Sequence, residues 1–148
     1  MIALLALALA AAAPAETPAA FVDRLYAAYR DPDYSPLARP ERVFAAPLVS
    51  EIREDARLSK DEVGYMDADP LCQCQDPTGL KPRIGAVRLS RRGRASVPVA
   101  IDFGSDRREL RLSLVRTSAG WRIADVATAD EPSLLQSLRR FNARRRSR

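Results

Sequence analysis

Residues 96–126 read SVPVAIDFGSDRRELRLSLVRTSAGWRIADV, and apolar side chains recur at every second position through most of them. A period of two is the pattern of a β-strand with one buried face. The segments GSDR and SAG interrupt the pattern and predict tight turns. Because short links between consecutive strands require antiparallel pairing, this stretch predicts three adjacent antiparallel strands.

The flanking segments complete the predicted fold. A fourth strand is expected just upstream, where Val87 and Leu89 alternate before the turn RRGR. Helices are expected from Thr17-Pro18, from about Glu41 to Arg57, where Pro47 either kinks the helix or marks its first turn, and from near Asp130 or Ser133. This order predicts an α+β domain with N-terminal helices packed against a curled, mostly antiparallel four-stranded sheet, followed by a C-terminal helix.

The N-terminus has the features of an export signal. Residues 1–15, MIALLALALAAAAPA, carry no charge and end in Ala13-Pro14-Ala15, a small-x-small pattern typical of signal peptidase sites. The apolar run is shorter than the roughly 20 residues that span a bilayer. We therefore predict a signal peptide over 1–15, cleavage near Ala15, a single domain over 16–138, and a periplasmic or secreted protein.

The positive charge is concentrated in a predicted basic tail over 139–148. The formal net charge is +5, but the last ten residues, RRFNARRRSR, hold six arginines and leave 18 basic and 19 acidic residues elsewhere. A near-neutral body argues against a nucleic-acid partner. At most, we expect peripheral contact with an anionic membrane through the tail arginines. These are Arg139, Arg140, Arg144, Arg145, Arg146 and Arg148.

The chain contains no histidine, which removes the usual general base and the commonest zinc ligand. Any catalysis would depend on carboxylates, tyrosines or thiols. No cofactor is expected, and the sequence favours a binding domain over an enzyme.

Both cysteines lie in the acidic segment DADPLCQCQD, residues 67–76. Side chains two residues apart point to one face of an extended chain, so Cys72 and Cys74 can form a disulfide in an oxidising compartment. The alternatives are a readily reduced redox bond, pairing between two chains, free thiols, or a soft-metal site closed by an aspartate. We favour the structural disulfide and expect no metal.

The same segment is the best ligand-facing candidate in the sequence. Its spacing does not match a calcium-binding loop, and aspartates beside Pro70 are typical turn residues. We interpret it as a disulfide-bonded acidic loop between the helices and the sheet. The candidate ligand-binding residues are Asp67, Asp69, Gln73, Gln75 and Asp76.

The DADPLCQCQD segment, and the strand GWRIADV before a Ser-Leu-Leu helix, resemble a family of small secreted bacterial proteins of unknown function. The resemblance covers nearly the whole mature chain. It implies a nuclear-transport-factor-2-like, cone-shaped (cystatin-like) fold of the kind found in ketosteroid isomerase. The family offers no assigned catalytic residues to transfer.

Asp125 is the most informative carboxylate under that resemblance. Strand alternation predicts that it shares a face with Trp121, where an unpaired charge is costly. A ketosteroid-isomerase-like enzyme places an aspartate base and a tyrosine in such a pocket, and Tyr26 or Tyr29 could supply the hydroxyl. The favoured alternative is a structural carboxylate bonded to an arginine such as Arg116 or to loop amides.

These features together predict an exported, non-enzymatic binding or accessory domain, whose partner is a small molecule, an envelope component or a protein. A small carboxylate-dependent lyase, isomerase or hydrolase with Asp125 in an apolar pocket is the first alternative. A surface adaptor that binds through the basic tail is the second.

Overall fold

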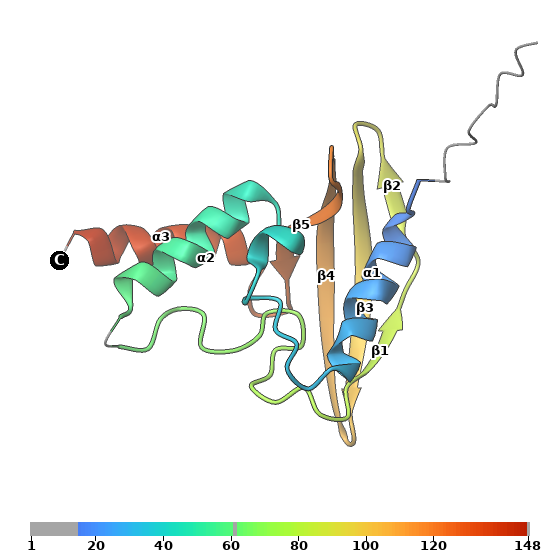
Figure 1. The fold of residues 1–148 in the computed structure, drawn as a ribbon, viewed down its shortest axis with the longest axis horizontal. Helices are drawn as coiled ribbons and strands as arrows, with labels where there is room; N and C mark the ends of the chain where they lie inside the picture. Colours follow the sequence, from blue (N-terminus) through green and yellow to red (C-terminus); the bar gives the residue numbers. More distant parts are fainter. Residues whose placement is uncertain (1–14, 61, 148) are drawn as a thin grey trace, which may run out of the picture.

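The computed structural model describes residues 15–60 and 62–147, so the predicted signal peptide lies outside the described residues except for Ala15. The α+β class and the C-terminal helix are confirmed (Figure 1). The helices are α1 (Pro18–Ala27), η1 (Ala28–Arg30), η2 (Pro40–Arg42), α2 (Ala46–Leu58) and α3 (Leu134–Arg146). The strands are β1 (Lys81–Ile84), β2 (Arg88–Ser90), β3 (Arg94–Phe103), β4 (Asp106–Thr117) and β5 (Gly120–Ala127).

The strands form one open antiparallel sheet with the order β1-β3-β4-β5, and β2 pairs beside β1 along the same side of β3. The predicted links between β3, β4 and β5 are confirmed as antiparallel hairpins. The sheet has five strands rather than the predicted four. The segment before the RRGR turn is interrupted and forms two short strands, β1 and β2, instead of one.

A β-bulge causes this interruption. The three residues Gly85–Val87 lie opposite only Val97 and Pro98 of β3, between the β1 and β2 registers. Gly85 donates its backbone N–H to the Pro98 carbonyl over 2.8 Å. Because Pro98 has no N–H to donate on that side, regular pairing cannot continue there. The alternation of Val87 and Leu89 does not mark a buried edge strand, since Leu89 is 70% exposed.

The core lies on one face of the sheet, called here the inner face. Alternate residues of β3 and β4 point into it and pack against α1, whose own stripe includes Phe21 and Leu25. Helix α1 begins as predicted, because the Thr17 hydroxyl accepts a hydrogen bond from the backbone N–H of Ala20. The inner-face residues of β3 and β4 are Val97, Val99, Ile101, Leu110, Leu112 and Leu114.

Helices α2 and α3 lie side by side and extend away from the β5 end of the sheet (Figure 1). The segment before α2 runs beside β5, with Ala45 donating to the Ile123 carbonyl and Ile123 donating to the Val43 carbonyl. The second helix therefore begins at Ala46, later than predicted, with Pro47 in its first turn. No helix in the described part of the chain is long and apolar enough to cross a membrane.

Candidate functional site

The cysteine segment is built into the core. Leu71 and Cys72 are fully buried and Cys74 is 9% exposed, and the two cysteines form a disulfide with a Cα–Cα distance of 5.1 Å. The backbone N–H of Asp69 donates to the Cys74 carbonyl, and that of Gln73 donates to the Asp69 carbonyl. The segment thus forms a tight turn whose apolar tip fills the space beside α1.

Two tyrosines of the N-terminal helical segment hold this turn in place. The Tyr26 hydroxyl donates to the Leu71 carbonyl over 2.8 Å, and the Tyr29 hydroxyl donates to Oδ2 of Asp69 over 2.7 Å. Burial, and then the nearby Asp69 carboxylate, raise the pKa of Tyr29. Burial also raises the pKa of Asp69, against the lowering effect of its hydrogen bonds from Tyr29 and the Leu71 amide. The hydroxyl of each candidate catalytic tyrosine therefore has a structural partner.

The structure places the five candidate ligand-binding residues in two groups, three at a hollow and two bonded within the local turns. Asp67, Asp69 and Gln75 line a hollow of about 250 Å³ beside Tyr34. Gln73 instead donates to the Pro70 carbonyl, and Asp76 accepts from the Thr78 amide in its own turn. Across residues 15–60 and 62–147, no three His, Cys, Asp or Glu side chains are grouped to hold a metal ion.

Asp125 lies at the start of α3. A bulge in β5 places Ser113 opposite Asp125 and Leu114 opposite Ile123, so Ala124 is an extra residue. The predicted shared face of Asp125 and Trp121 is therefore wrong, and Val126 takes the buried position instead.

The partners of Asp125 are those of a helix cap. One oxygen accepts from the backbone N–H groups of Val126 and Leu135, and the other accepts from the hydroxyl of Ser133, the N-cap residue. A carboxylate is stabilised at a helix N-terminus by the unpaired N–H groups and by the helix dipole. The structure does not bring Asp125 together with Tyr26 or Tyr29.

The arginines of the predicted tail belong largely to α3, which continues to Arg146. Arg145 pairs with Glu62 at 2.9 Å, and Arg146 pairs with Glu54 at 3.0 Å. Asn142 is fully buried and donates to the backbone carbonyl and the carboxylate of Glu51. This segment holds α3 against α2, and Arg148 lies outside the described residues.

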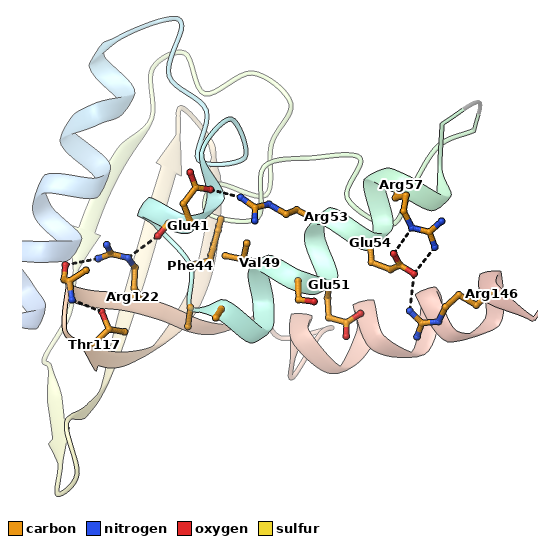
Figure 2. Close-up of a pocket in the computed structure, with 14 residues that line it drawn as sticks. Glu41, Phe44, Val49, Glu51, Arg53, Glu54, Arg57, Thr117, Arg122 and Arg146 are labelled. Carbon is orange, nitrogen blue, oxygen red and sulfur yellow. Dashed lines mark hydrogen bonds and ion pairs between the residues drawn. The ribbon is translucent and has the colours of Figure 1, made fainter.

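A groove of about 670 Å³ runs along α2, between the β4–β5 hairpin, η2 and the end of α3 (Figure 2). Apolar side chains, including Phe44 and Val49, form part of its lining. Its rim is charged, with carboxylates and guanidinium groups that point toward one another (Figure 2). These rim residues are Glu41, Glu51, Arg53, Glu54, Arg57, Arg122 and Arg146.

The charges of this groove, called here the α2 groove, are largely paired within the protein. Arg53 contacts Glu41 at 2.8 Å, and Glu54 accepts hydrogen bonds from both Arg57 and Arg146. Those two donors hold the pKa of Glu54 at about 2, below its ordinary 4.5. Arg122 donates to backbone carbonyls, including that of Glu41. A partner entering the groove would have to displace these contacts.

Sequence reasoning missed Asp55, which is 2% exposed in α2. Its two oxygens accept from the backbone N–H groups of Tyr65 and Met66, each over 2.9 Å. Gly64 allows this close approach, because an added Cβ would lie 2.7 Å from the Asp55 carboxylate. The signal in the sequence was helical spacing, since Asp55 follows Ile52 by three positions and therefore lies on the apolar stripe of α2.

Comparison with known proteins gives a likeness of fold. No protein-family model matches the chain, and no curated protein matches it. A chain from the crystal structure of the type VI native effector–immunity complex Tae3–Tai3 from Ralstonia pickettii is similar, with a TM-score of 0.58 and 20% sequence identity. The match covers 76% of this chain and 95% of that chain.

This likeness corrects the resemblance drawn from the sequence. The expected nuclear-transport-factor-2-like fold is wrong, because the fold likeness found is to a chain of the effector–immunity complex, of which it covers 95%. The helix pair α2–α3 extends from the β5 end of an open sheet, whereas the expected cone-shaped fold has helices that enclose a pocket (Figure 1). The same alternation of apolar residues suits both arrangements, so the sequence pattern did not separate them.

Proposed function

We propose that this chain is an exported binding protein of the immunity type, which holds a protein partner outside the cytoplasm. The observation that carries the proposal is the fold likeness to a chain of an effector–immunity complex over 95% of that chain. Proteins of this kind act by forming a complex, so they need an exposed recognition surface rather than a catalytic centre.

The positions of the candidate catalytic groups support a binding role. Tyr26 and Tyr29 hold the cysteine turn, and Asp125 caps α3. Each of these groups already has a structural partner within the domain. The enzyme alternative required Asp125 and a helix tyrosine to line one pocket, and these residues lie in separate parts of the fold.

Two features support a periplasmic or extracellular location. The uncharged apolar run with a small-x-small motif before Glu16 suits cleavage near Ala15. The Cys72–Cys74 disulfide suits an oxidising compartment. The proposed mature domain runs from Glu16, and the basic residues after 138 stabilise α3 against α2.

Deleting the gene in the cells that produce the chain tests the proposal, and the test does not require the partner to be identified. The deletion strain is grown in contact with its parent, and with a parent lacking a type VI apparatus. We expect the deletion strain to lose at least about tenfold in recovery against the first parent only, and a plasmid copy to restore it. Equal recovery against both parents would contradict an immunity role.

A further inference from the structure

The side of the sheet that faces away from the core, called here the outer face, carries an excess of positive charge. Alternation along the strands places seven basic and three acidic residues there. The basic residues are Lys81, Arg83, Arg88, Arg94, Arg107, Arg111 and Arg122. The acidic residues are Asp102, Glu109 and Asp125.

The three carboxylates of the outer face are already engaged. Asp102 pairs with Arg83 at 2.7 Å, and Glu109 pairs with Arg107 at 3.2 Å. Asp125 is bound at the start of α3. Among the described residues, four of the basic side chains have neither a carboxylate within ion-pair distance nor, unlike Arg122, a side-chain hydrogen bond to a backbone carbonyl. These are Lys81, Arg88, Arg94 and Arg111.

The outer face also has a hollow of about 530 Å³ with a partly apolar lining. Gly85, Pro98, Ala100 and Ala127 contribute small or apolar surface, and Arg111 stands at its side. Gly85 lies directly against Pro98 in this lining, since an added Cβ would lie 2.8 Å from the Pro98 ring. A shallow apolar floor beside arginines is typical of the centre of a protein–protein interface.

The chemistry of these groups defines what would bind. A guanidinium donates two parallel hydrogen bonds to a carboxylate, and such pairs gain strength where water is partly excluded. Small floor residues leave room for the backbone and short side chains of a peptide segment. A phosphate backbone carries a negative charge at every nucleotide, so part of it would lie against the ion pairs of Asp102 and Glu109 rather than against the unpaired arginines. An acidic protein segment also carries apolar side chains, which can lie against the apolar lining of the hollow.

We infer that the outer face of β1–β4 is the recognition surface, and that it binds an acidic segment of the protein partner through Arg111 and Arg88. This inference rests on the proposed function and specifies the surface and partner chemistry for it. The Arg111 guanidinium holds a carboxylate of the segment beside the hollow, and Arg88 and Arg94 extend the contact along the β2 side of the sheet.

Charge reversal on the outer face tests the inference. The full chain carrying Arg88→Glu and Arg111→Glu is compared with a chain carrying Arg30→Glu and Arg42→Glu, which has the same net charge. Arg30 and Arg42 are exposed on η1 and η2, outside the strands of the sheet. Thermal unfolding and cellular abundance are measured for both, because only equally folded variants are compared.

The contact competition assay then separates the two proposals. We expect the control variant to restore the deletion strain fully and the outer-face variant to leave it at least about tenfold less recovered. Full restoration by the outer-face variant would overturn the assigned surface while leaving the immunity role intact. A deletion strain that recovers equally against both parents would instead contradict the immunity role. Direct binding would then test the surface independently.

Direct binding uses defined probes and NMR. The oxidised, ¹⁵N-labelled chain is titrated with a synthetic glutamate-rich peptide, its glutamine counterpart, a single-stranded DNA oligonucleotide, and phosphatidylglycerol vesicles. We expect the glutamate peptide alone to shift the amides of Ala100, Arg111 and Ala127, and the outer-face variant to lose those shifts. Absence of these shifts, or stronger binding of DNA or vesicles at the same amides, would overturn the inference.

Discussion

The α2 groove and the outer face of the sheet are both rich in arginine, and they differ in what the arginines contact. In the groove, Arg53, Arg57 and Arg146 each meet a glutamate of the same domain. On the outer face, Arg88 and Arg111 meet no carboxylate in the described part of the chain. The larger hollow is therefore the less available one, because its charges already stabilise the helix pair. Cavity size and charge content alone would select the groove, whereas the pairing of the charges favours the sheet.

The comparison predicts that polar groups around α2 and α3 contribute stability. The largest effect is expected for Asp55→Ala, which leaves the buried N–H groups of Tyr65 and Met66 without an acceptor. We expect a loss of about 3 kcal/mol in the free energy of unfolding, measured by urea denaturation. Asp55→Asn retains one acceptor oxygen and should lose less. A loss below about 1 kcal/mol for the alanine variant would show that water replaces the carboxylate.

Asp125 lies on the outer face and caps α3, and its substitution tests which of these two positions explains its role. Asp125→Asn removes the negative charge from the start of α3 and weakens the contact with Ser133. We expect a loss of about 1–2 kcal/mol in urea denaturation, with recovery in the competition assay unchanged. Unchanged stability combined with lost recovery would assign this carboxylate to the partner or to catalysis.

Protonation of Glu54 should weaken its charge pairs in the groove at low pH. Because the pKa of Glu54 is lowered to about 2 in the folded protein, its stabilising contribution is present above about pH 4.5 and is lost as the pH falls toward 2. The melting temperature of the wild type should therefore exceed that of Glu54→Gln at pH 6 by a small amount.

The difference in melting temperature between the wild type and Glu54→Gln should shrink as the pH falls from about 4.5 to about 2. Glu109→Gln on the outer face, which contacts one arginine at 3.2 Å, is the matched comparison and should change the melting temperature less at about pH 6. A Glu54 difference that persists unchanged at about pH 2 would contradict the pairing described for the groove.

The smallest effect on stability is expected on the outer face itself. Arg111→Ser removes an exposed side chain without an ion pair among the described residues, so the free energy of unfolding should change by less than about 0.5 kcal/mol. Urea denaturation under the conditions used for Asp55→Ala gives the measurement. A loss above about 1 kcal/mol would place Arg111 among the stabilising groups and remove the contrast between the two surfaces.

The sequence predicted the elements well where the pattern is local. The period of two through β3–β5 and the Thr17 cap depend on neighbours within a few residues, so they could be identified without the fold. The start of α3 was narrowed to Asp130 or Ser133, and the structure selects Ser133. The two bulges could not be identified in this way, because each depends on the register with another strand. One separates β1 from β2, and the other turns Asp125 away from the face of Trp121.

The outer face was harder to predict, because the net charge of the whole chain does not show how its charges are distributed over the folded surface. A near-neutral body hid the segregation of basic residues onto alternate positions of the strands, which emerges only when strand phase and pairing are known. The burial of the cysteine segment was hidden for a similar reason. It depends on Tyr26 and Tyr29, 40 and more residues away, a contact that no local spacing records.

The bulge at Gly85 has a consequence for how the protein behaves at high concentration. An open sheet with a long, flat edge is a template for fibrillar aggregation, because another copy can add its own strand. Here the edge is broken by the bulge, Pro82 lacks a backbone donor, and β2 carries the charged side chain of Arg88. This edge is therefore a poor template for a strand from another copy.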